Sequence, residues 1–439
     1  MELILKEWQE VWTPKLKERN IPELDVDSKV RKILTFTGVR RCGKTYSMFQ
    51  VINNLKEKYG KENIFYINFE DERIEKKTET LTNLIPSLIK VYGDGDKKYF
   101  LFLDELQIMP EWSRWLRRVY DNYRNITFFV SGSTSKLSSR EIPTELRGRA
   151  LDYEIFPLSF KEFLEFKDVE IEKDFLFSER NLGMIKNLLS DYITYGGFPE
   201  IVLIDGEANK RRIIQDYFRT IINRDILERY NLKNKSLLSD FFISLLNTTH
   251  FSVNKTVNTF KSQGKTAGKN TIINYTRYAE ESYFCYFLPV FSYKIKSQAQ
   301  HPKKVYFADN SFITALSLKL SKNLGKLYEN TVFLELKRKQ SRNLFMDIYY
   351  WKNQLNEEVD FVIKENQKIK QLIQVCCNID DADTKGREIR SLLKASKELK
   401  CKNLIMITEE YEGESEEEWF GIKGKIKYIP LWKWLLENR

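Results

Sequence analysis

Short apolar runs alternate with amphipathic stretches over the first 157 residues of the chain. The runs are rich in β-branched and aromatic residues and fall at residues 33–37, 64–69, 99–103, 126–130 and 151–155. Segments with helical periodicity separate them and end near residues 59, 92 and 123. The run at 99–103 is continuous and apolar, which is typical of a strand buried on both faces. Strands that alternate with helices predict an α/β fold, with a parallel sheet covered by helices on both faces.

The pattern changes after residue 157. Residues 158–235 predict several helices, interrupted by the Gly-Gly-Phe-Pro sequence at 196–199. Residues 236–305 predict helices and a short basic hairpin, and residues 306–439 predict a second α/β unit. Its helix is expected at 384–399, and its strands are expected at 346–352, 359–364, 369–376 and 403–408. These changes divide the chain into four parts, at residues 1–157, 158–235, 236–305 and 306–439.

Composition narrows the class of protein. The chain has 439 residues, 42% of them hydrophobic and 31% charged, so it can bury a large core without disulfides. No apolar stretch approaches the ~18 residues of a membrane helix, and the first ten residues lack a signal-peptide cleavage site. Five cysteines form no CxxC pair and two histidines lack motif context, which argues against a zinc site and a His-activated nucleophile. We expect a cytoplasmic protein, whose formal charge of +10 raises the question of an anionic partner.

The turn after the first apolar run has the sequence Gly-Val-Arg-Arg-Cys-Gly-Lys-Thr, at residues 38–45. It fits the phosphate-loop pattern G-x-x-x-x-G-K-[ST] and lies between a predicted strand and a predicted helix, as this pattern requires. Glycines let backbone N–H groups approach a phosphate, and the helix N-terminus adds a positive partial charge. Lys44 would reach the β- and γ-phosphates, and the Thr45 hydroxyl would bind Mg²⁺. A chance glycine-rich turn is the alternative, and the candidate nucleotide-binding residues are Gly38, Val39, Arg40, Arg41, Cys42, Gly43, Lys44, Thr45 and Tyr46.

Two acids, Asp104 and Glu105, follow the apolar run at 99–103. An Asp at the tip of a buried strand beside a phosphate loop can hold Mg²⁺, and the adjacent Glu can polarise the attacking water. Two acids after an apolar strand are weak evidence for a nucleotide site by themselves, but strong evidence when a phosphate loop precedes them in the sequence. We therefore assign Thr45 and Asp104 to the metal, and Glu105 and Lys44 to catalysis. A helix N-cap carboxylate is the alternative for Glu105.

Three further groups of polar residues are candidates for the surroundings of the γ-phosphate. Ser131 and Ser133 follow the fourth apolar run and could orient the water, or form a plain turn. Arg147 and Arg149 precede the fifth run, and either could reach the γ-phosphate in the same subunit or in a neighbour, or be solvated. The acids at 70–71 follow the second run and could support the metal or cap a helix. Of these residues, Ser133, Arg147 and Arg149 join the catalytic candidates.

These motifs occur in the order found in a known family. The segments that carry the resemblance are GVRRCGKT (38–45), FYINFEDER (65–73), FLDELQ (102–107), VSGSTSKL (130–137), ELRGRA (145–150), FPLSFKEFL (156–164), YGGFPE (195–200) and RDILERY (224–230). Over essentially its whole length the chain resembles the archaeal and bacterial AAA-type P-loop ATPases that carry a C-terminal domain of unknown function. The resemblance implies ATP and Mg²⁺ as cofactors. It also implies an AAA+ core, a helical lid region, a winged helix and a domain similar to PD-(D/E)xK nucleases, at residues 1–157, 158–235, 236–305 and 306–439.

A basic segment lies in the middle of the chain. Residues 252–304 contain nine basic and two acidic residues, a net charge of +7. Their pattern predicts a helix, a turn at 264–268 and a second helix, the layout of a helix-turn-helix. Ile273 is expected to pack inward, and Lys304 is expected on the wing, where it would track phosphates. A module used only for protein packing is the alternative, and the candidate DNA contacts are Lys265, Lys269, Asn270, Asn274, Arg277, Lys294 and Lys296.

The last part of the chain resembles a nuclease whose metal site is incomplete. Such a nuclease needs an Asp on one strand and an acid-x-Lys on the next, so that the acids hold Mg²⁺ and the Lys activates water. Asp360 fits, with Glu329 on a preceding helix, but Gln374 and Cys376 replace the acid and the lysine. We expect an inactive nuclease-like domain. Residues 409–418 carry seven glutamates and no basic residue, so we expect a solvated loop there.

Three hypotheses about function follow. The leading one is an ATPase that couples binding and hydrolysis of Mg·ATP to rearrangement of the winged-helix and C-terminal domains, on DNA or without it. The second is a nucleotide-gated protein-interaction switch with no role on DNA, and the third is a metal-dependent nuclease. The expected partners are ATP or ADP, with double-stranded DNA or an unknown protein client, and no membrane. Whether the chain forms a homo-oligomer stays open, and with it whether an arginine acts within one subunit or across an interface.

Overall fold

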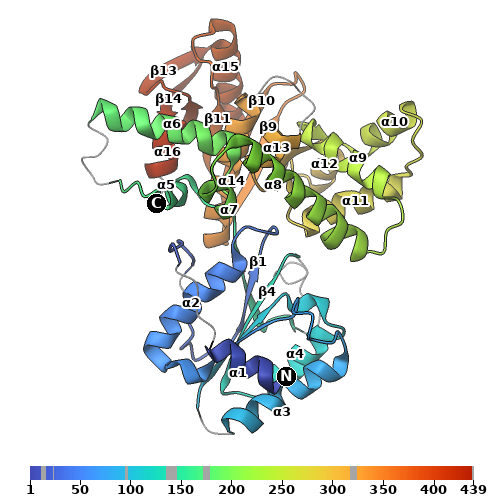
Figure 1. The fold of residues 1–439 in the computed structure, drawn as a ribbon. Coiled ribbons are helices and arrows are strands. Elements are labelled where there is room, and N and C mark those ends of the chain that lie inside the picture. The colour runs from blue at the N-terminus through green and yellow to red at the C-terminus, as the bar shows by residue number, and fades with distance from the viewer. Residues whose placement is uncertain are drawn as a thin grey trace. The chain divides into compact units, whose positions relative to one another are not determined.

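The structure is a computed structural model that describes residues 1–10, 16–22, 24–93, 97–134, 146–171, 178–316 and 324–437. The chain divides into two compact units (Figure 1). The first contains Met1–Phe156 and Glu281–Tyr283, and the second contains Pro157–Glu280 and Phe284–Arg439. No helix in the described ranges is long and apolar enough to cross a lipid bilayer.

A five-stranded parallel sheet forms the core of the first unit (Figure 1). Across the sheet the order is β2-β3-β4-β1-β5, and every neighbouring pair is parallel. The central strands β1, β3 and β4 are buried along their whole length, as expected where helices cover both faces. The prediction of a parallel sheet is confirmed, and its strands are β1 (Ile33–Thr37), β2 (Ile64–Asn68), β3 (Tyr99–Asp104), β4 (Ile126–Gly132) and β5 (Ala150–Glu154).

Helices cover both faces of this sheet. On one face, Leu5 of α1, Leu81 of α3 and Leu116 of α4 join a single buried cluster with alternate residues of the strands. On the other face lies α2, whose Tyr59 packs against Phe100 with ring centroids 4.7 Å apart. Both layers arise because side chains alternate between the two faces of a strand. The helices of this unit are α1 (Glu2–Glu10), α2 (Lys44–Tyr59), η1 (Lys61–Asn63), α3 (Thr78–Tyr92), η2 (Leu106–Ile108) and α4 (Trp112–Asn122).

The second unit begins with a run of helices, as predicted for residues 158–235. A capping box starts the first of them, because the side chains of Ser159 and Glu162 each accept a hydrogen bond from the other's backbone N–H. The predicted glycine break is also observed. Gly196 has φ +77°, and a Cβ there would lie 1.6 Å from Asp309 Oδ1, so the position excludes any other residue. These helices are α5 (Phe160–Phe166), α6 (Glu179–Tyr195), α7 (Pro199–Leu203), α8 (Glu207–Thr220) and the π-helix η6 (Ile221–Glu228).

Three helices, a short helix and a small antiparallel sheet follow, and we call them the helix-turn-helix module. The helices predicted on either side of a turn at 264–268 are present as α10 and α11. The strand order of the small sheet is β6-β8-β7. The elements of the module are α9 (Lys235–Leu246), β6 (His250–Phe251), α10 (Val253–Ser262), α11 (Lys269–Glu281), β7 (Cys285–Leu288), α12 (Ile295–Gln300) and β8 (Lys303–Phe307).

Two expectations about the module are wrong. Ile273 does not pack inward: it is 44% exposed, and Ile272 is fully buried in its place, because one residue changes the direction of a helical side chain by about 100°. Lys304 does not lie on a solvated wing either. It is 2% exposed and is surrounded by carboxylates. In addition, the segment between β7 and β8 contains the helix α12 in place of a simple hairpin.

A six-stranded mixed sheet forms the core of the last part of the chain, which confirms the predicted second α/β unit. Its order is β13-β14-β12-β11-β10-β9, and Leu392 and Leu393 of α15 pack into its core. The elements are α13 (Asn310–Leu316), α14 (Leu324–Arg342), β9 (Met346–Lys352), β10 (Glu358–Glu365), β11 (Lys368–Val375), α15 (Ala382–Leu399), β12 (Leu404–Thr408), β13 (Gly413–Trp419), β14 (Ile422–Pro430) and α16 (Leu431–Glu437).

The expectation of a solvated loop at 409–418 is wrong. Residues Gly413–Trp419 form the edge strand β13, which pairs with β14. In the register of this pair Glu414 lies opposite Lys427, and Glu418 lies opposite Lys423. Opposite charges on directly facing residues stabilise an antiparallel pair, so the glutamates belong to a charged ladder.

Candidate nucleotide-binding site

The phosphate loop at residues 38–43 connects β1 to α2. Lys44, the first residue of α2, is only 6% exposed. Its ammonium donates hydrogen bonds to the backbone oxygens of Gly38 and Val39, both at 3.1 Å. The helix N-terminus and the Lys44 ammonium therefore meet at the same loop, which is the arrangement that attracts a phosphate.

Gly38 starts the loop at a place that has no room for a side chain. Its φ is +140°, and a Cβ would lie 2.2 Å from the backbone oxygen of Ile155. The Ile155 N–H in turn donates to the Thr37 oxygen at 2.7 Å, so the chain after β5 fixes the start of the loop. Cys42 is fully buried, and burial raises the pKa of its thiol, which makes it a neutral packing group.

Thr45 and Asp104 meet at the carboxyl edge of the sheet. The Thr45 hydroxyl donates to Asp104 Oδ2 at 2.8 Å, and the same oxygen accepts a hydrogen bond from the Tyr66 hydroxyl at 2.6 Å. The other oxygen, Oδ1, accepts from the Ser131 hydroxyl. Three hydroxyl donors thus hold a carboxylate that is 2% exposed in one orientation. A hydroxyl and a carboxylate side by side are ligands that Mg²⁺ accepts, so these residues fit the expected metal.

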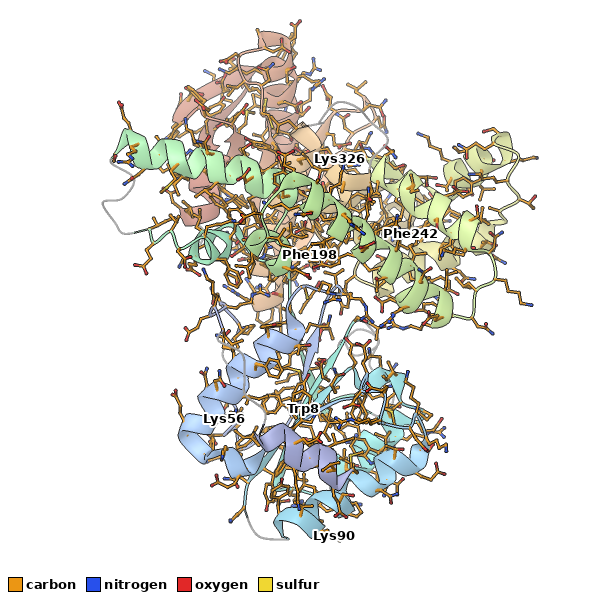
Figure 2. The ribbon with its side chains drawn as sticks, viewed as in Figure 1. Trp8, Lys56, Lys90, Phe198, Phe242 and Lys326 are labelled. Atoms are coloured by element: carbon orange, nitrogen blue, oxygen red, sulfur yellow. The ribbon has the colours of Figure 1, made fainter. Side chains whose placement is uncertain are left out.

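The strand order explains the partners of Asp104. β4 lies between β1 and β3, which brings Ser131 to the acid from one side, and β2 brings Tyr66 from the other. Burial and the Asp104 charge raise the pKa of Tyr66 far above its usual range, so the phenol stays a donor. Trp8 of α1, which is labelled in Figure 2, packs against Tyr66 with ring centroids 4.4 Å apart. Tyr66 could not be recognised from the sequence, because it lies within an apolar run, where nothing distinguishes it from core residues.

Glu105 lies at the tip of β3 with φ +54°, a left-handed conformation that costs a non-glycine residue roughly 1–2 kcal/mol. Its carboxylate accepts a hydrogen bond from the Gln107 amide at 2.5 Å, and its N–H donates to Ser131 Oγ at 3.2 Å. Glu105 precedes η2 but makes no capping bond through its side chain. The cap alternative is therefore not observed.

The remaining candidates near the loop lie in different surroundings. Ser133 follows β4 and is fully buried, while Ser131 is the serine that binds Asp104. Glu70 pairs with Arg40 of the phosphate loop at 3.4 Å. Asp71 pairs with Arg73 at 2.7 Å. The acids at 70–71 thus bind arginines, one of them in the loop.

The two arginines precede β5 and lie at the opposite edge of the sheet. The Arg149 backbone oxygen accepts from Ile33 N–H at the start of β1, and its guanidinium pairs with Asp121 at 3.0 Å. β1 has five residues, so at ~3.3 Å per residue Arg149 lies about 15 Å from the phosphate loop. Arg147 is exposed beside it. This geometry gives no support to a role in the same subunit, and a role in a neighbouring subunit stays a prediction.

Arg19 supports the phosphate loop from the segment before β1. Its guanidinium donates to the backbone oxygens of Cys42 at 2.8 Å and Phe156 at 3.0 Å. Its backbone exchanges two hydrogen bonds of 2.9 Å with the side chain of Gln50 in α2. Arg19 thus joins the loop, the helix after it and the chain after β5. Arg19 could not be assigned a role from the sequence, because it lies outside any motif.

The candidate DNA contacts lie on the helix-turn-helix module of the second unit. Lys265 pairs with Asp240 of α9 at 2.6 Å. Lys294 and Lys296 are exposed at the start of α12. One face of α11 is exposed and has helical spacing, and its residues are Lys269, Asn270, Ile273, Asn274 and Arg277.

Comparisons with known proteins cover nearly the whole chain. An AAA domain matches residues 30–164, and two domains of unknown function, DUF8612 and DUF4143, match residues 186–324 and 324–434. An uncharacterized protein of Methanocaldococcus jannaschii is 38% identical, over 96% of this chain and 92% of the relative. An uncharacterized protein of Haemophilus influenzae is 29% identical, over 92% of this chain and 94% of the relative. The Walker-type ATPase of Pyrococcus abyssi superposes with a TM-score of 0.42 and 13% identity, over 72% of this chain and 94% of that chain, which is too low to support an argument.

The AAA match spans all five strands of the parallel sheet and the phosphate loop. The first unit is therefore an AAA-type P-loop ATPase domain, which confirms the expected core. The chain belongs to the same family as the Methanocaldococcus jannaschii protein, with this domain followed by the two domains of unknown function. The winged helix and the nuclease-like domain stay predictions.

Proposed function

We propose that the chain binds ATP at the phosphate loop and hydrolyses it with Mg²⁺ held by Thr45 and Asp104. The observation that carries the proposal is the 2.8 Å hydrogen bond between these two side chains, behind a loop of the right sequence. Lys44 would move from the loop oxygens to the β- and γ-phosphates, since a phosphate is the stronger acceptor for an ammonium. Mg²⁺, when bound, would neutralise charge on the phosphates and orient them.

Glu105 is the proposed residue that polarises the attacking water. Gln107 and Ser131 position it, through the carboxylate and the backbone N–H respectively. Because Ser131 also binds Asp104, the same hydroxyl group links the proposed metal ligand to the proposed base. An arginine from a neighbouring copy, Arg147 or Arg149, would complete the site if the chain oligomerises.

Lys44→Ala tests this proposal, with Lys56→Ala as the matched control. Both lysines lie on α2, about three turns apart, so each variant removes one ammonium from the same helix. We expect Lys44→Ala to lose at least about 100-fold in hydrolysis rate, because a preorganised positive group at the phosphates is removed. Lys56→Ala should keep the parent rate. Equal hydrolysis by Lys44→Ala and the parent would contradict the proposed site.

DNA binding by the helix-turn-helix module is the second candidate function. It rests on the exposed face of α11, where Lys269 and Arg277 flank Asn270 and Asn274. Lysine can contact phosphates, and arginine and asparagine side chains can bind guanine and adenine edges in the major groove. The predicted winged helix would place α11 in that groove. ATP hydrolysis would then change the placement of this module and of the C-terminal domain on DNA.

Fluorescence anisotropy with duplex DNA at several salt concentrations tests the second candidate. Removing two charges by Lys269→Ala and Arg277→Ala should weaken binding and reduce the salt slope by about two. Arg211→Ala with Arg212→Ala removes the same charge from an exposed part of α8 and should leave the slope unchanged. Equal slopes for both double variants would favour the alternative, a nucleotide-gated protein-interaction switch.

A further inference from the structure

A buried ammonium lies among three carboxylates in the second unit. Lys304 of β8 is 2% exposed, and its Nζ lies 2.8 Å from Glu329 Oε1, 2.7 Å from Glu358 Oε1 and 2.7 Å from Asp360 Oδ1. Glu329 comes from α14, and the other two acids come from β10. The Tyr306 hydroxyl adds a hydrogen bond of 2.5 Å to Glu329. We call these three acids and Lys304 the acid cluster.

The acid cluster contains the residues that a PD-(D/E)xK nuclease would use for Mg²⁺, but they do not fit a metal. Asp360 Oδ1 is bound by Lys304, and Oδ2 accepts from Val375 N–H at 2.9 Å. Gln374 turns its oxygen to Asp360 N–H at 3.1 Å and its amide to Glu388 at 2.7 Å. Within the described part of the chain, no group of three or more acidic, His or Cys side chains is arranged to hold a metal ion.

We infer that the Lys304 ammonium is the resident cation of the acid cluster, and that it joins the helix-turn-helix module to the C-terminal sheet as one body. An ammonium has three donors, and Lys304 has a carboxylate oxygen for each of them. It therefore binds the three acids at one point, as a metal ion would, and offsets one of their negative charges. The consequence is that this domain takes no catalytic metal and cannot move independently of the module.

Two further links connect the same parts. His250 of β6 lies 2.9 Å from Glu358 Oε2, so two strands of the small sheet reach the same β10 residue. Lys326 of α14 (Figure 2) donates to the backbone oxygens of Leu246 and Thr248, at 2.8 and 3.0 Å, and thereby caps the C-terminus of α9. Polar side chains of β6 and β8 therefore reach β10, and a polar side chain of α14 reaches the end of α9.

The energetics of the acid cluster make the inference testable. Removing one partner of a buried ion pair is costly because the other charges stay buried without compensation. Burial by itself would lower the pKa of Lys304, and the charges of Asp360, Glu329 and Glu358 raise it well above its ordinary value. The ammonium therefore stays charged at neutral pH, whereas burial raises the pKa of Asp360 from 3.8 to about 7.

The test is thermal unfolding of the full chain in EDTA, without nucleotide. Lys304→Met keeps the length of the side chain and should lower Tm by roughly 5–10 °C, whereas Lys303→Met, on the same strand and partly exposed, should change it by no more than about 2 °C. Adding Glu329→Gln and Asp360→Asn to Lys304→Met should restore at least half of the loss, because the remaining Glu358 keeps His250 and Lys352. No loss in Lys304→Met, or no recovery in the triple variant, would overturn the inference.

A second measurement uses the parent protein, so it does not depend on whether Lys304→Met folds. Bound Mn²⁺ is counted by electron paramagnetic resonance, without nucleotide, in the parent and in Asp360→Asn. We expect the two proteins to bind the same amount, because Lys304 fills the position. A manganese ion that the parent binds and Asp360→Asn loses would overturn the inference and restore the nuclease hypothesis.

Discussion

Thr45 and Asp104 lie 59 positions apart in the sequence, and the hydroxyl of one donates to the carboxylate of the other at 2.8 Å. Thr45 is the second residue of α2, which follows β1, and Asp104 ends the buried strand β3, two positions from β1 in the sheet. The sheet alone determines this meeting, since parallel strands end at the same edge. The fold thus brings together the two side chains that are proposed to hold Mg²⁺.

Asp104→Asn should change the Mg²⁺ requirement of hydrolysis. An amide is a weaker ligand than a carboxylate for a hard cation, so about 10–100-fold more Mg²⁺ should be needed for half of the maximal rate. Titrating Mg²⁺ at saturating ATP measures this. Asp121→Asn is the control, because Asp121 binds Arg149 at the other edge of the sheet. Identical Mg²⁺ curves for Asp104→Asn and the parent would remove Asp104 from the metal site.

Gly38→Ala should abolish nucleotide binding and destabilise the first unit. The new Cβ would lie 2.2 Å from the Ile155 oxygen, so the loop must shift, at a cost of at least about 2 kcal/mol. Isothermal titration with ATP and urea unfolding measure the two effects.

Gly183→Ala is the matched control for this substitution. Gly183 lies within α6, and a Cβ there meets nothing within 4 Å. The unfolding free energy should rise by up to about 1 kcal/mol, since alanine is the better helix former. ATP binding by Gly38→Ala at the parent affinity would show that the loop tolerates a side chain, contrary to the geometry.

The free energy of unfolding of the second unit should fall as the pH rises, because the buried carboxyl of Asp309 must then ionise. Burial raises the pKa of Asp309 from an ordinary 3.8 to about 6, so the folded protein prefers the neutral carboxyl. Its contribution to stability is fully present below the ordinary pKa and is lost as the pH rises through about 6. The shift corresponds to about 3 kcal/mol.

Asp309→Asn cannot titrate at this position, which provides the comparison. Between about pH 4 and pH 7, the variant should lose about 2 kcal/mol less of its unfolding free energy than the parent, because part of the loss already occurs below pH 4. Urea unfolding at both pH values measures this difference. The variant's overall stability is a separate matter, because its amide replaces one of the acceptors for Gly197 and Ser311 N–H. Parallel pH profiles would show that folding leaves the pKa of Asp309 at its ordinary value.

The five strands of the first unit could be predicted because each is a short apolar run. A strand that is buried on both faces has apolar residues at nearly every position. Asp104, Thr45 and Lys44 could be assigned because loop and strand tip have fixed sequence patterns. Tyr66 could not, since a tyrosine within an apolar strand looks like core. The edge of the sheet at which Arg149 lies could have been predicted, since residues that precede a strand of a parallel sheet lie opposite the phosphate loop.

In the second unit, the errors have two causes. β13 was missed because charged residues alternate along it, and only the lysines of β14 show why that alternation is stable. Lys304 was placed on the surface because an isolated lysine in a basic segment is usually solvated. Its carboxylate partners are 25 to 56 positions away, and nothing local in the sequence indicates them.

The most direct test of the central claim is the state of the nucleotide bound to Glu105→Gln. The variant and the parent are mixed with Mg·ATP, separated from free nucleotide, and the bound nucleotide is identified by chromatography. Gln has the shape of Glu but cannot take a proton, so the account predicts intact ATP on Glu105→Gln and ADP on the parent. ADP on both proteins, formed at the same rate, would contradict the proposed hydrolytic site.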